Sequence, residues 1–202
     1  MELELKKECL DTYELGEPQT LTQEETAETI VPDYCPDIAR IISAEGVVCL
    51  HGGTEQDGVT GTVRVTVLYT PENESGVRAL EFAMPFSAQG EGLAGCAHVV
   101  VETEIELLES RMLNPRKIFT RCKLVTHLAG CRKVCLTISS DAETDPALLV
   151  EKRCCGQTVS LLRQVAEKDL TFSETMSLSL GREGAAELLH CRANGIMTET
   201  KA

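Results

Sequence analysis

Aromatic side chains are the scarcest part of this sequence. Among 202 residues there is no tryptophan, and aromatic residues make up only 3% of the chain, although hydrophobic residues reach 43%. A core built from this composition is therefore aliphatic, and its many β-branched residues favour strands. The three tyrosines offer few flat faces for stacking on sugar rings, which weighs against a cell-wall glycan-binding β module without removing that alternative; they are Tyr13, Tyr34 and Tyr69.

Basic residues are also few, because 19 Lys and Arg face 32 Asp and Glu, and the formal net charge is −13. The imbalance is strongest at the start of the chain, where residues 1–35 hold ten acidic residues and only two lysines. Nucleic acid and anionic membranes both attract basic surfaces, so the sequence predicts neither as a partner. No apolar run approaches the roughly 18 residues of a membrane span, and the first ten residues do not resemble a secretion signal. We therefore expect a cytoplasmic protein.

Signatures of catalysis are missing as well. The chain contains no GxGxxG, GxxxxGK[ST], GxSxG or HExxH motif, and no local signature pairs Cys35 with a histidine. We expect no enzyme activity, no catalytic residue and no cofactor.

Cysteine, in contrast, occurs ten times. A disulfide framework is not expected in a chain without a secretion signal, and the sequence favours reduced thiols within the core. A zinc site remains the alternative, because three residues separate one pair of cysteines on a predicted strand and a second pair is adjacent. These candidates are Cys131, Cys135, Cys154 and Cys155. Buried thiols remain the favoured interpretation.

Apolar and polar residues alternate through the middle of the chain. Residues 59–69 carry apolar side chains at every second position, which predicts a half-buried antiparallel strand. Residues 98–128 predict a long hairpin that turns at Asn114–Pro115, with glutamates on one strand facing basic residues on the other. We predict a mainly β fold, an antiparallel β-sandwich or partly open barrel. Its expected core is Ile38, Ile41, Val63, Val65, Val67, Leu80, Phe82, Val101, Ile105, Leu107, Ile118 and Leu124.

The stretch ETIVPDYCPDIARII, residues 28–42, interrupts this alternation. Ile38, Ile41 and Ile42 follow the spacing of one helical face, so we predict a short helix near residues 36–44 that ends at Gly46. The turn before it is our candidate for a specific protein contact. Its residues are Pro32, Asp33, Tyr34, Pro36 and Asp37.

The chain also contains a weak internal repeat. Residues 36–46 align without gaps to residues 183–193, which suggests a second copy of the same unit. We divide the chain into an acidic segment or edge strand (1–21), a β domain (22–140), a connecting segment with a strand (141–168) and the start of a truncated second repeat (169–202).

Three ordered motifs resemble the SPOCS domain family. They are QEETAETIVPDYCPDIARII, GTVRVTVLYTPENESGVRALEFAMPF and EIELLESRMLNPRKIFTR, and the resemblance spans residues 22–128 and weakly 169–202. This module occurs in SipL-like spore-coat morphogenesis proteins of endospore-forming Firmicutes. The resemblance implies a non-enzymatic role in spore-coat or spore-envelope assembly, in the mother cell at the forespore surface. The implied partners are other spore-coat morphogenesis proteins or further copies of the chain.

Overall fold

The computed structural model describes residues 4–51 and 58–143, together with isolated positions between 151 and 191. The described residues form strands and connecting loops, with no helix among them. The strands are β1 (Glu4–Leu15), β2 (Gln19–Ile30), β3 (Ile38–Leu50), β4 (Gly58–Pro71), β5 (Arg78–Gln89), β6 (His98–Asn114) and β7 (Lys117–Glu143). The predicted mainly β fold is confirmed.

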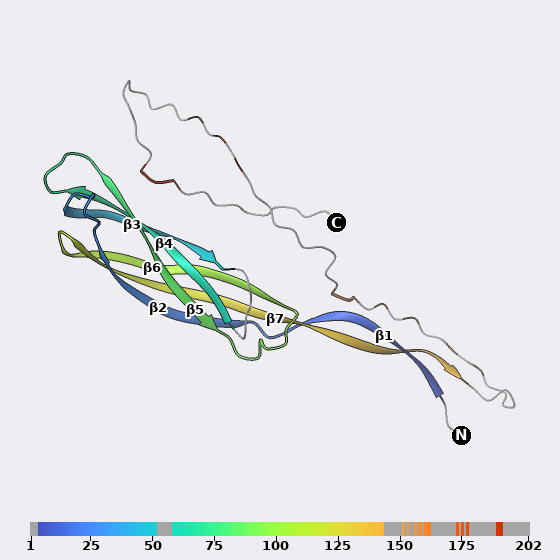
Figure 1. Ribbon diagram of the computed structural model, residues 1–202. Coiled ribbons are helices and arrows are strands. Elements are labelled where there is room, and N and C mark those ends of the chain that lie inside the picture. The colour runs from blue at the N-terminus through green and yellow to red at the C-terminus, as the bar shows by residue number, and fades with distance from the viewer. Residues whose placement is uncertain are drawn as a thin grey trace.

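Two antiparallel sheets make up the fold (Figure 1). In the smaller sheet the order is β3-β4-β5. The larger sheet is organised around the 27-residue strand β7. Both β2 and β6 pair with its first half, whereas β1 pairs with residues 131–143 of its second half. The sheets pack face to face without closing into a barrel, so the result is an open sandwich.

The core lies between the two sheets and is aliphatic, as the composition predicted. Strand β4 runs through it with Val63, Val65, Val67 and Tyr69 fully buried, which confirms the predicted alternation. Most of the other predicted core residues are buried or packed against this cluster: Ile38, Ile41, Leu80, Phe82, Ile105, Ile118 and Leu124. Val101 instead packs on a smaller cluster around Leu93 and Leu128.

The predicted hairpin is present, and its strands meet around Asn114 and Lys117. Its register shifts between Ile105 and Leu107, so the side chain that reaches the core is Leu108 and not the expected Leu107. A β-bulge of this kind adds one residue and reverses which face the following side chains occupy. The predicted pairing of acidic with basic residues is nevertheless found, as in the Lys123–Glu106 ion pair at 2.9 Å.

The helix predicted near residues 36–44 is wrong. Residues 38–50 form strand β3, and its register against β4 shifts between Ile38 and Arg40 and again between Ile41 and Ser43. Each shift changes the alternation by one residue. Ile38 and Ile41 therefore both reach the core at a helix-like spacing of three, while Ile42 is exposed. Gly46, expected to end the helix, is buried within the strand.

Two of the expected domain boundaries fall inside strands. The boundary after residue 21 divides β2, and the boundary after residue 140 divides β7. Most of residues 141–168 and 169–202, including most of the proposed second repeat, lie outside the described residues.

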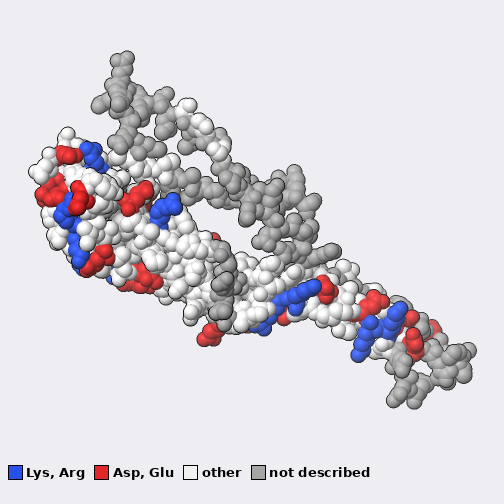
Figure 2. Space-filling view, viewed as in Figure 1, with Lys and Arg blue, Asp and Glu red and all other residues white. Residues whose placement is uncertain are grey.

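Strand β1 and residues 131–143 of β7 form a two-stranded ribbon that extends from the sandwich, which we call the arm (Figure 1). Acidic and basic side chains are intermixed along it (Figure 2). Cys9 and Cys135 form a disulfide across the arm, with their Cα atoms 5.6 Å apart. The expectation of reduced thiols is therefore corrected for this pair. It holds for Cys122, a free thiol that is fully buried in the core.

Candidate functional site

The candidate contact turn lies in the loop of residues 31–38, which carries the chain from β2 in one sheet to β3 in the other. Val31 and Ile38 at its two ends are fully buried in the core. Between them the amide of Cys35 donates a 2.9 Å hydrogen bond to the carbonyl of Pro32, which closes a tight turn. The loop is thus held at both ends and in its middle.

Arg116, in the β6–β7 turn, binds this loop through its side chain. Its Nη1 donates to the carbonyl oxygen of Cys35 at 2.7 Å and to Oδ1 of Asp37 at 3.0 Å. Its Nη2 donates to the carbonyl oxygen of Val31 at 2.9 Å and to Oδ1 of Asp33 at 3.1 Å. One planar guanidinium therefore satisfies two carbonyls and two carboxylates, a task to which its fixed geometry is suited.

Backbone hydrogen bonds complete the connection between loop and hairpin. The amides of Val31 and Ile38 donate to the carbonyls of Arg116 and Pro115, each at 2.9 Å. The Asn114 side chain accepts from the Arg116 amide at 2.9 Å, which holds the hairpin turn in place. The loop and the turn therefore form one braced unit.

Tyr69 supports the loop from the core side. Its hydroxyl donates to the carbonyl of Pro36 at 3.3 Å. Burial raises the pKa of this phenol above its ordinary value of 10.0, and the neighbouring Cys35 adds to the effect. The hydroxyl therefore stays protonated and can keep donating its hydrogen bond well above neutral pH.

The five predicted contact residues divide into two groups. Pro32, Pro36 and Asp37 are partly buried, and Asp37 is held by Arg116. Asp33 and Tyr34 are exposed, Asp33 while still accepting a hydrogen bond from Arg116, and Tyr34 is 88% exposed. The sequence missed Arg116. The signal that the sequence did offer is the pair Asp33 and Asp37, because two acidic residues in a proline-bounded turn favour a basic partner.

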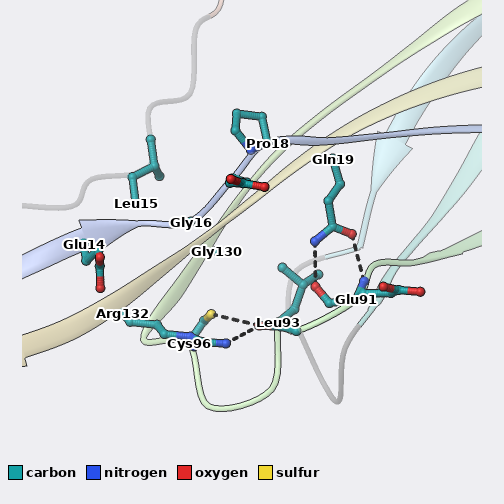
Figure 3. A pocket seen from close by; sticks show the side chains of 12 residues that line it. Glu14, Leu15, Gly16, Pro18, Gln19, Glu91, Leu93, Cys96, Gly130 and Arg132 are labelled. Carbon is teal, nitrogen blue, oxygen red and sulfur yellow. Dashed lines mark hydrogen bonds between the residues drawn. The ribbon is translucent and has the colours of Figure 1, made fainter.

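A concave region lies away from this loop, where the arm leaves the sandwich (Figure 3). It is an open groove of about 610 Å³ between the β1–β2 link and the loop after β5. The Gln19 side chain exchanges two hydrogen bonds with the Glu91 backbone, at 2.6 and 2.8 Å, and Arg132 donates to the Gly92 carbonyl at 2.6 Å. These contacts fasten the base of the arm to the sandwich.

The cysteine candidates for zinc are not gathered into a site. Cys135 is bonded to Cys9, Cys131 is a free and partly buried thiol, and Cys154 and Cys155 lie outside the described residues. Within the described part of the chain, no group of three or more His, Cys, Asp or Glu residues has the geometry to hold a metal ion. That part also contains no helix long and apolar enough to cross a membrane.

Comparisons with protein-family models, with curated proteins and with solved structures found no match to this chain.

Proposed function

We propose that this protein is a non-enzymatic structural module that works by protein–protein contact through the 31–38 loop. The observation that carries the proposal is the exposed Tyr34 ring on a loop braced by Arg116. Tyrosine is among the residues that dominate binding energies at protein interfaces. A loop already held in place loses little conformational entropy on binding, so more of the contact energy appears as affinity.

The resemblance to the SPOCS family supplies the proposed setting, which is spore-coat or spore-envelope assembly in the mother cell of a sporulating bacterium. Its partners there are other spore-coat morphogenesis proteins or further copies of this chain. Two of the three motifs that carry the resemblance contact each other at this loop, since VPDYCPDI and NPRK donate hydrogen bonds to each other. This contact supports treating the two motifs as one recognition unit.

The experiment is a pull-down from sporulating cells with the tagged chain, followed by identification of the recovered proteins. The wild-type chain should recover a coat or envelope protein, and Tyr34→Ala should lower that recovery at least about tenfold, as loss of an interface anchor does. Val100→Ala is the matched control, because it trims another exposed side chain at the opposite end of the hairpin.

Both variants should melt at the wild-type temperature, because neither side chain is buried. Recovery of no coat or envelope protein by the wild-type chain would contradict the proposed setting. Undiminished recovery by Tyr34→Ala would remove the loop as the contact.

A further inference from the structure

The arm is a two-stranded ribbon with apolar side chains exposed to water. Leu5, Leu15 and Leu136 are 48%, 50% and 38% exposed, although each lies in a strand. An isolated two-stranded ribbon is only marginally stable in water, and a third strand or a packed face normally supports it. The disulfide Cys9–Cys135 joins the two strands of this ribbon and the Arg132 hydrogen bond fastens its base to the sandwich, but neither contact covers these leucines.

Within the described part of the chain, one edge of the arm presents backbone groups that no strand pairs with. Strand β6 begins at His98, opposite Cys131, and the Ala97 amide donates to the Cys131 carbonyl just before it. Backbone groups alternate in direction along a strand, so those of Lys133, Cys135 and Thr137 point to the same side as Cys131. Among the described residues, no strand pairs with β7 on that side beyond Cys131.

The opposite edge of the arm confirms this assignment of directions. Tyr13 lies across from Lys133, and its amide donates outward to the Leu162 carbonyl at 3.1 Å. In an antiparallel pair the two facing residues turn their backbone groups either both toward or both away from each other. Because Tyr13 turns outward on one edge, Lys133 turns outward on the other.

The other strand edges of the sandwich carry features that discourage pairing with another chain. Strand β5 contains Pro85, β3 contains two register shifts, and β2 and β6 are rich in glutamate. Prolines, bulges and charges are the usual protections of sheet edges. Residues 134–140 of β7, VCLTISS, contain no proline and no charge, so among the described strand edges this one resembles a pairing template.

The charges at the two ends of this segment indicate what pairs with it. Arg132 and Lys133 precede the segment, and Asp141 and Glu143 follow it. A second copy in antiparallel orientation brings the basic end of each copy to the acidic end of the other, whereas parallel pairing sets like charges together. With a two-fold axis at Thr137, Leu136 of one copy faces Ile138 of the second copy.

We propose that two copies of this chain associate through the open edge of β7, centred on Thr137 within residues 135–139, to form a continuous four-stranded antiparallel sheet from two arms. The contact is isologous, so the same residues serve both copies and the assembly closes as a dimer. This inference deepens the proposed contact function, on which it rests, by naming a second copy as one partner.

The test is sedimentation equilibrium of the full chain over a range of concentrations, comparing wild type with Thr137→Pro and Thr137→Val. Wild type should show a monomer–dimer equilibrium. Proline removes the Thr137 N–H, which points to the open edge and makes no bond to β1, so the dimer should weaken at least about tenfold. Thr137→Val keeps that N–H and the strand shape, so it should dimerise as wild type does.

A wild-type chain that remains monomeric throughout the concentration range would overturn the proposal, as would a Thr137→Pro variant that dimerises normally. A dimer that a non-reducing gel shows to be joined by an intermolecular disulfide would overturn it too. These outcomes are separate from the test of the 31–38 loop, because Tyr34→Ala should leave the dimer intact. A monomeric wild type that still recovers a coat protein would remove the arm contact and leave the proposed function standing.

Discussion

At the scale of the residue, Arg116 organises the candidate site. Its side chain is only one third exposed and makes four hydrogen bonds to the 31–38 loop. Two of its acceptors are backbone carbonyls, whose positions depend on how the loop folds. Sequence patterns that record spacing along the chain could not connect Arg116 to Val31, because 85 residues separate them.

We predict that Arg116→Ala lowers the free energy of unfolding by about 2 kcal/mol. Hydrogen bonds from a charged donor contribute about 1.5–3 kcal/mol, and contact with water reduces what this partly exposed group provides. Urea denaturation followed by circular dichroism measures the change. Arg111→Ala is the control, because it removes an exposed arginine that stacks on Phe119 and should cost about 0.5–1 kcal/mol. Equal losses for the two variants would contradict the bracing role of Arg116.

At the scale of the element, strand β3 has apolar residues at the spacing that is typical of a helix. Its apolar residues at positions 38, 41 and 42 have helical spacing, but isoleucine is β-branched and fits a strand well. The hydrogen bonds to β4 decide in favour of the strand. Its register shifts at two places, and each shift accommodates one residue that has no partner in β4. The strand buries Ile38 fully and leaves Ile42 52% exposed, although a helix would place both on one face.

This difference predicts unequal costs for two similar substitutions. Ile38→Ala should lower the free energy of unfolding by about 2–5 kcal/mol, because it leaves a cavity in the core. Ile42→Ala should change it by less than about 1 kcal/mol, because its side chain is half in water. Thermal or urea unfolding of both variants measures the two values. Similar large losses at both positions would favour the helix and contradict β3.

At the scale of the whole molecule, the two sheets pack closely against each other at Gly46, where β3 meets β6. A Cβ atom added at Gly46 would lie 2.8 Å from Cδ1 of Ile105, 3.1 Å from Cδ2 of Leu108 and 3.2 Å from Cγ1 of Val63. Gly46 therefore provides the space in which Ile105 and Leu108 of the opposite sheet pack beside Val63 of its own sheet. Gly46, which the sequence predicted to end a helix, instead allows the two sheets to pack closely together.

We predict that Gly46→Val destabilises the protein by about 1–3 kcal/mol, the usual cost of overpacking a core. Strand propensity alone predicts the opposite sign, since valine favours strands and glycine does not. The sign of the change in urea midpoint therefore decides between the two effects. Val47→Ala, at an exposed neighbouring position, should shift the free energy by no more than about 0.5 kcal/mol.

The sequence by itself determined the mainly β class, the aliphatic core along β4 and the hairpin that turns at Asn114, because each depends on local alternation and turn residues. Only the tertiary structure decided the strand at 38–50, the place of Leu108 in the core, the disulfide of the arm and the pairing of Arg116 with the 31–38 loop. Each of these depends on the register between segments distant in the chain. A β-bulge shifts that register by one residue and leaves no local mark in the sequence.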